Sequence, residues 1–105
     1  MDHGHRNAID DVANLIDEFV RDKTDDLLEL CHDLTACNSI NPPGSTVETA
    51  QVIQNFLKKN GIKSELLSLD VSKPNLVSTI DSQKLGRHLI FNGHMDTVSP
   101  GKQSD

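Results

Sequence analysis

A chain of 105 residues forms one domain at most. Its formal net charge is −6, and its ten Lys and Arg residues are scattered apart from Lys58-Lys59, which argues against nucleic acid or an anionic membrane as a partner because phosphate binding needs clustered basic side chains. No stretch approaches the roughly 20 apolar residues of a membrane span, and the polar N-terminus does not suit a secretory signal, so we expect a cytoplasmic protein.

Two helices are predicted in the first third of the chain. From Ile9 onward, apolar residues recur at intervals of three and four, which predicts an amphipathic helix whose acidic face lies in solvent. Thr24 is expected to cap a second helix, which has two aspartates in its first turn and ends near Ala36. The pattern leaves open whether these are two helices or one bent rod. Cys31 falls on the apolar stripe and is expected to be a small buried hydrophobe. The two stripes consist of Ile9, Val12, Ala13, Ile16, Phe19, Val20, Leu27, Leu30, Cys31 and Leu34.

A third helix is predicted after the stretch Asn41-Pro42-Pro43-Gly44, which cannot continue a helix because each proline restricts the residue before it. Ser45 and Glu48 form a capping box, with Ser45 as the N-cap, so the helix should begin at Thr46. Asn60-Gly61 should end it, since glycine accepts the left-handed conformation that closes a helix. Its expected buried face consists of Val47, Ala50, Ile53, Phe56 and Leu57.

The rest of the chain predicts three strands. Residues 63–70 alternate as a sheet-edge strand does, and residues 75–80 are short and β-branched. A glycine-containing turn at 81–87 favours an antiparallel hairpin from 75–80 to 88–92. Because residues 89–91 are all apolar, both faces of that last strand need burial, as in a central strand of a layered α/β domain. A central strand needs a neighbour on each side, so we expect the sheet to be incomplete in this chain.

His94 and Asp96 are the candidate site residues. In an extended chain their side chains point the same way, so the Asp96 carboxylate can accept a hydrogen bond from the imidazole. Such a carboxylate fixes the tautomer of a zinc-bound histidine, which makes His94 the candidate metal ligand and Asp96 the residue that orients it. Gly93 allows close approach of a ligand or backbone. The alternative is an ordinary surface hydrogen bond, because His-x-Asp is a pattern of only three residues.

Two motifs resemble a known family. The string Phe91-Asn92-Gly93-His94-Met95-Asp96-Thr97-Val98, with Pro100-Gly101 behind it and Asn41-Pro42-Pro43-Gly44 upstream, resembles the opening of the zinc amidohydrolases. That family contains aminoacylases, acetylornithine deacetylases, succinyl-diaminopimelate desuccinylases and glutamate carboxypeptidases. The likeness runs from about Asp25 to Gly101. Asn38 and Ser99 depart from it, since the family commonly has proline at these places.

The resemblance implies an α/β fold, namely the N-terminal part of a layered helix and mixed-sheet catalytic domain of the zinc exopeptidase type. Residues 1–23 would form an N-terminal helix and tail, and residues 24–105 the truncated start of the catalytic domain. Members of the family are several times longer, and their bridging aspartate, general-base glutamate and remaining ligands match nothing before Asp105. We therefore expect the chain alone to be inactive.

The activity implied is zinc-dependent hydrolysis of an amide bond in N-acyl amino acids or small peptides. His94 would bind one of two zinc ions, with cobalt as the alternative metal, and Asp96 would be the active-site residue that orients and polarises it. A longer form of the protein could be a homodimer. Two alternatives remain: a non-catalytic product that binds a protein partner, for instance through an unpaired strand edge, and a truncated reading frame without a function.

Overall fold

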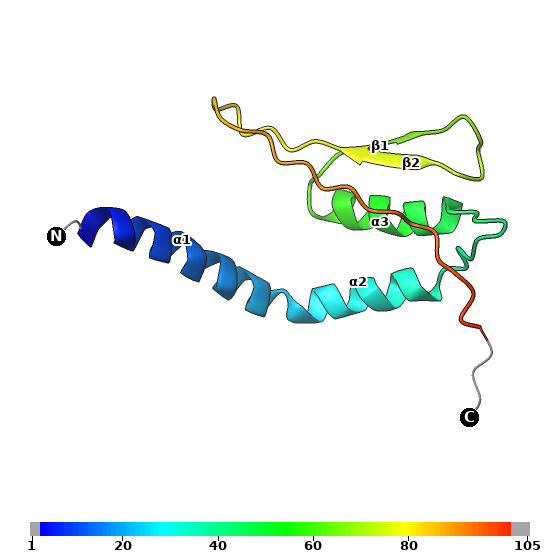
Figure 1. Ribbon diagram of the computed structural model, residues 1–105, viewed down its shortest axis with the longest axis horizontal. Helices are drawn as coiled ribbons and strands as arrows, with labels where there is room; N and C mark the ends of the chain where they lie inside the picture. The colour runs from blue at the N-terminus through cyan, green and yellow to red at the C-terminus, as the bar shows by residue number, and fades with distance from the viewer. Residues whose placement is uncertain (1–2, 102–105) are drawn as a thin grey trace. The chain divides into compact units, whose positions relative to one another are not determined.

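A computed structural model describes residues 3–101, with side chains from residue 7 onward, and has a mixed α/β composition (Figure 1). The chain divides into two units, residues 1–32 and 33–105, and each is considered by itself. The elements are α1 (His3–Asp22), α2 (Thr24–Ala36), α3 (Val47–Lys59), β1 (Ser64–Leu67) and β2 (Asn75–Ser78).

The junction of α1 and α2 consists of Lys23 alone, and the hydrogen-bond ladder runs through it. The Lys23 N–H donates to the Phe19 carbonyl at 3.1 Å, and the Leu27 N–H donates to the Lys23 carbonyl at 2.9 Å. The Thr24 hydroxyl donates to the Val20 carbonyl at 3.2 Å. The predicted cap at Thr24 is therefore wrong, because its hydroxyl bonds back to the preceding turn instead of accepting from the helix it begins.

The apolar stripe of α1 is uncovered within its own unit. Ile16 and Phe19 are 57% and 64% exposed, because residues 3–32 form a single run of helix without a second layer to bury them. Cys31 is exposed as well, so the prediction that it is buried is wrong for the same reason. No helix among residues 3–101 combines the length and the apolar character needed to cross a bilayer.

The start of α3 differs from the predicted capping box. Thr46, not Ser45, holds the N-cap position, and its side chain makes no capping hydrogen bond. Its N–H donates instead to the Ser72 carbonyl at 2.9 Å, so the helix start is fixed by the β1–β2 connection. This shift of one residue puts Glu48 at the second helical position, whereas a capping box requires it at the third.

The end of α3 is as predicted. Gly61 has a φ of +75°. Its N–H donates to the Lys58 carbonyl at 3.0 Å, and the Ile62 N–H donates to the Leu57 carbonyl at 2.8 Å. These two bonds make a Schellman motif, which satisfies carbonyls that the helix end would otherwise leave free.

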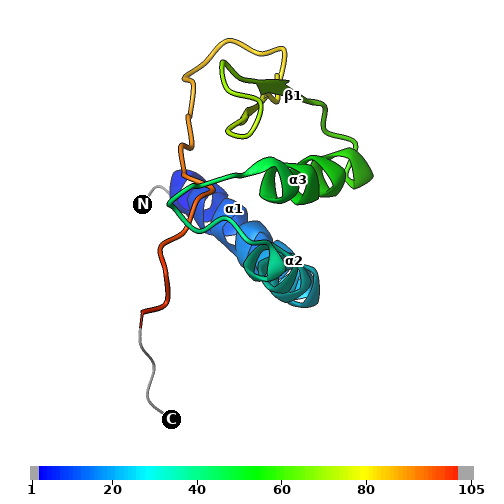
Figure 2. The same cartoon turned by 90° about the vertical axis from the view of Figure 1, so that its right-hand side faces the viewer.

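The small core of the second unit lies where α3 contacts both strands. Figure 2 shows α3 beneath β1. Ala50 is fully buried, whereas Ile53, Phe56 and Leu57 are half-buried. This confirms most of the predicted face, although Val47 is exposed. Burial of these side chains is what holds the helix on the hairpin.

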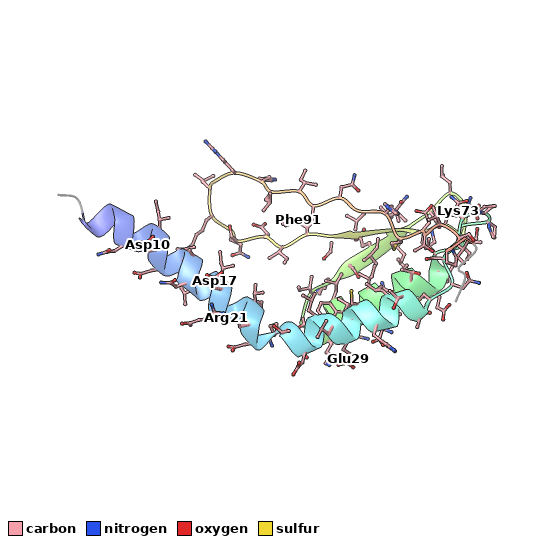
Figure 3. All side chains as sticks on the ribbon, turned by 60° about the horizontal axis from the view of Figure 1, so that its bottom comes forward. Asp10, Asp17, Arg21, Glu29, Lys73 and Phe91 are labelled. Atoms are coloured by element: carbon pink, nitrogen blue, oxygen red, sulfur yellow. The ribbon has the colours of Figure 1, made fainter. Side chains whose placement is uncertain are left out.

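Strands β1 and β2 pair antiparallel, with Ser64 opposite Ser78 and Leu67 opposite Asn75. The predicted hairpin between 75–80 and 88–92 is therefore wrong: β2 takes β1 as its partner, and residues 88–92 form no strand in the described chain. Phe91, labelled in Figure 3, is 88% exposed on this extended segment. The side chains of this apolar run favour burial, but residues 33–101 provide neither a paired strand nor a covering layer for it.

Candidate metal-binding site

The two motifs that resemble the zinc amidohydrolases meet in the structure. Ile40 and Thr97 form an isolated parallel β-bridge. The Thr97 N–H donates to the Ser39 carbonyl at 2.9 Å, and the Asn41 N–H donates to the Thr97 carbonyl at 2.8 Å. The N–H and the carbonyl of Thr97 both make these hydrogen bonds. They connect the segment before the prolines to the segment that carries the candidate ligand.

Side chains reinforce this bridge. Ser39 is 2% exposed, and its Oγ lies 3.3 Å from Thr97 Oγ1, a hydrogen bond in which either hydroxyl can be the donor. On the other side, the Gly44 N–H donates to the Ile40 carbonyl at 2.9 Å. Gly44 has a φ of +74°, which turns the chain back so closely that a Cβ at this position would lie 3.0 Å from Asn41 Cγ. Glycine is therefore required both by the backbone and by the approach of Asn41.

His94 and Asp96 contact each other as predicted. Their spacing of two residues puts both side chains on one side of an extended segment, and His94 Nδ1 lies 3.0 Å from Asp96 Oδ1. The same nitrogen lies 2.8 Å from the Asp96 backbone carbonyl. Both oxygens only accept hydrogen bonds, so Nδ1 is the donor, and in the neutral form of the ring the lone pair is on Nε2.

Asn41 is the site residue that the sequence reasoning missed. Its Nδ2 donates to Asp96 Oδ2 at 3.0 Å, so the two carboxylate oxygens have different partners. This hydrogen bond is the main cause that lowers the pKa of Asp96 below its ordinary value; desolvation opposes it, and His94 adds to it. Asp96 is consequently an acceptor-only carboxylate at neutral pH. The upstream motif Asn41-Pro42-Pro43-Gly44 was the available signal, but in the sequence it indicated only the interruption of a helix and the family resemblance.

The imidazole of His94 is open to solvent, with 84% of its side chain exposed, whereas Asp96 is 36% exposed. A neutral imidazole with Nε2 free and a carboxylate behind Nδ1 has the donor chemistry of a zinc-binding histidine. Residues 3–101 bring together no group of three or more His, Cys, Asp or Glu side chains that would hold a metal ion. Asp105, the one later carboxylate, lies outside the described residues.

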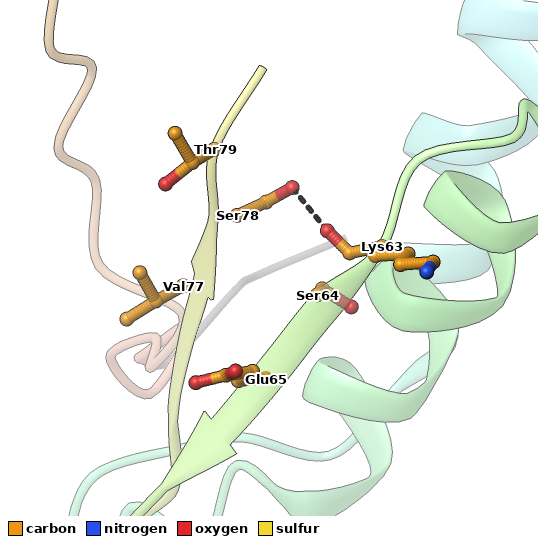
Figure 4. A pocket seen from close by; sticks show the side chains of 6 residues that line it. All are labelled: Lys63, Ser64, Glu65, Val77, Ser78 and Thr79. Atoms are coloured by element: carbon orange, nitrogen blue, oxygen red, sulfur yellow. Dashed lines mark hydrogen bonds between the residues drawn. The ribbon is translucent and has the colours of Figure 1, made fainter. Parts of the chain in front are cut away.

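A separate hollow lies over the hairpin (Figure 4). The Ser78 hydroxyl donates to the Lys63 carbonyl there at 2.7 Å. None of the residues of the candidate metal-binding site lines this hollow, so it does not extend that site. Its lining consists of Lys63, Ser64, Glu65, Val77, Ser78 and Thr79.

Comparisons with known proteins found no match: no protein-family model, no curated protein and no solved structure matches the chain.

Proposed function

We propose that this chain supplies the first part of a zinc-dependent amidohydrolase site, with His94 as a zinc ligand through Nε2 and Asp96 as the residue that orients it. The observation that carries the proposal is the contact of Asp96 with both motifs, at 3.0 Å from His94 and 3.0 Å from Asn41. Two motifs of one family would be expected to share a site, and here one carboxylate joins them.

The chemistry follows from this donor set. A bound zinc ion would polarise the carbonyl of an amide substrate and lower the pKa of a water molecule. The residues of this chain would orient the ligand: Asp96 would keep the proton on Nδ1, so that Nε2 presents its lone pair to the metal. A catalytic zinc takes about three protein ligands, so further ligands and the general base would come from residues outside this set.

The finer fold assignment belongs to the same proposal. We propose that residues 88–92 become a central strand of a layered catalytic domain once neighbouring strands pair with them. The support is the exposure of Leu89, Ile90 and Phe91, which are 79%, 83% and 88% exposed. Three consecutive apolar side chains alternate between the two faces of a strand, so burying all of them requires a layer on each face.

The test is turnover by the protein purified from its native cells, at the length it has there. The substrates are a panel of N-acetyl and N-succinyl amino acids and dipeptides, with and without a zinc chelator. We expect amide hydrolysis that the chelator abolishes and that His94→Ala abolishes as well. His88→Ala, which removes an exposed histidine from the same segment, is the matched control and should retain activity. Full activity of the His94→Ala protein would contradict the proposal.

Protein binding is the second candidate function, and the exposed face of α1 favours it. At about 3.6 residues per turn, Ile9, Val12, Ile16 and Phe19 form one stripe. Aspartates border this stripe on both sides: Asp10 and Asp17, labelled in Figure 3, on one side, and Asp11 and Asp22 on the other. A second copy would place like charges together, so the complementary partner is an amphipathic helix with Lys or Arg on its borders.

A further inference from the structure

The carboxylate of Asp96 is held at two points, one on each oxygen. Oδ1 lies 3.0 Å from His94 Nδ1, and Oδ2 accepts from Asn41 Nδ2 at 3.0 Å. The terminal torsion of an aspartate is broad, so a carboxylate with one partner rotates easily. With a donor on each oxygen, rotation breaks at least one hydrogen bond. The orientation that faces the imidazole is therefore the one that Asn41 favours.

Asn41 is itself firmly placed. Its N–H donates at 2.8 Å to the carbonyl of Thr97, the residue after Asp96. The backbone of Asn41 is therefore fixed to the segment that contains Asp96. Its side chain passes over Gly44, whose missing Cβ would lie 3.2 Å from Asn41 Cβ and 3.0 Å from Cγ. A donor fixed by its own backbone loses little conformational entropy when it makes a hydrogen bond, so the contact with Asp96 is preorganised.

We infer that Asn41 is a positioning residue of the candidate metal-binding site: it fixes the Asp96 carboxylate so that His94 keeps its proton on Nδ1 and presents Nε2 to a ligand. Asn41 does not touch the ligand and acts through Asp96. The inference rests on the proposed function in one respect only, namely the identity of the ligand that Nε2 binds. The tautomer itself is a property of these three side chains without any metal.

The experiment is nitrogen NMR of the His94 imidazole in the metal-free protein, at a fixed pH where the ring is neutral. The population of the Nδ1–H tautomer is measured in the wild type and in Asn41→Ala. We expect this tautomer to predominate in the wild type and the ratio of the two tautomers to fall about two- to fivefold in Asn41→Ala, which is what one exposed hydrogen bond supplies. The Asp96 backbone carbonyl remains as an acceptor, so the loss is partial.

Asn38→Ala is the matched control, because it removes an amide three residues away whose Oδ1 accepts from the Ile40 N–H at 3.5 Å. It should leave the tautomer ratio unchanged. An unchanged ratio in Asn41→Ala would overturn the inference, and so would an equal change in both variants, which would mean general loosening of the segment.

A second variant covers the case in which Asn41→Ala disturbs the pairing of Ile40 and Thr97, visible as a shift of the Thr97 amide signal. Asn41→Asp has the same shape but places an acceptor against Asp96 Oδ2. It should lower the Nδ1–H population at least as much as Asn41→Ala, and an unchanged population would overturn the inference. Failure of this inference is distinguishable from failure of the proposed function. The first is read from the tautomer ratio of the metal-free protein and the second from zinc-dependent turnover, and the two measurements are independent.

Discussion

Asn41 and Asp96 lie 55 residues apart in the sequence and are joined by a hydrogen bond of 3.0 Å. This contact brings the proline-containing turn and the His-x-Asp segment into one site. It gives the turn a chemical role beyond changing the direction of the chain, since the amide that precedes the two prolines holds the carboxylate that faces His94. The predictions below test this site and the elements that support it.

Gly44 and Gly61, two of the glycines with a positive φ angle, allow the cost of backbone strain to be separated from that of a side-chain contact. Gly44→Ala and Gly61→Ala should each cost about 1–2 kcal/mol of unfolding free energy, because both place a side chain in the left-handed region. Only Gly44→Ala puts a Cβ against the Asn41 side chain, since nothing lies within 4 Å at Gly61. Chemical denaturation measures the first effect. The NMR shift of the Asn41 side-chain amide measures the second, and an unchanged shift in Gly44→Ala would contradict the described packing.

The connection between β1 and β2 should become less ordered at low pH, when the Asp70 carboxylate is protonated. The Ser72 hydroxyl at 2.7 Å and the Ser72 N–H at 2.9 Å both donate to Asp70 Oδ1, and together they hold the pKa of Asp70 below its ordinary value. A lowered pKa in the folded state means that the stabilisation is present above the ordinary pKa of aspartate and is lost as the pH falls through the lowered value.

The measurement for Asp70 is carboxyl carbon NMR across the acid range. Ser72→Ala removes the larger of the two effects and should raise the pKa of Asp70 towards its ordinary value. Ser78→Ala removes a hydroxyl that bonds to Lys63 instead, so it serves as the control and should leave the pKa of Asp70 unchanged. If Ser72→Ala also left it unchanged, the hydroxyl contact would be absent in solution.

Thr49 offers a site for stabilisation. Its side chain is 5% exposed in α3, and its hydroxyl is buried without a hydrogen-bond partner among the described residues. Thr49→Val keeps the shape and removes the unpaired hydroxyl, so we expect about 1 kcal/mol of added stability by chemical denaturation. Thr79→Val, at an exposed position, should change stability by less than about 0.5 kcal/mol. A Thr49→Val protein less stable than the wild type would mean that the hydroxyl has a partner in solution.

The exposed face of α1 can be tested with synthetic helical peptides. One peptide has leucine at the apolar positions with lysine on both borders, and a second replaces those lysines with glutamate. We expect the lysine peptide to bind in fluorescence anisotropy, with an affinity that falls as salt rises, and Ile16→Asp, in the centre of the stripe, to abolish this binding. Equal binding of both peptides, self-association of the protein, or binding to zwitterionic vesicles in place of the lysine peptide would contradict the proposed basic partner.

Local sequence patterns predicted those features of the fold that depend only on residues close together in the sequence. Apolar spacing located α1 to α3, Gly61 marked the end of α3, and the alternation of an extended chain put His94 beside Asp96. Each of these needs information from within a few residues, so the sequence carries it directly.

Long-range pairing escaped prediction for a physical reason. An apolar run at 88–92 reveals that these side chains need burial but not which strand pairs with them, and β2 pairs with β1 instead. Likewise, the predicted capping box does not form, and the N-cap position falls one residue later, where the Thr46 N–H bonds to the carbonyl of Ser72, which is distant in sequence. Asn41 was missed as a partner of Asp96 for the same reason, since no local spacing connects them.

The most direct test of the central claim is the zinc content of the protein purified from its native cells, at the length it has there. We predict that the protein contains zinc, with the metal reduced or lost in His94→Ala and retained in His88→Ala. A wild-type protein without zinc, or equal zinc in the wild type and His94→Ala, would contradict the assignment of His94 as a ligand.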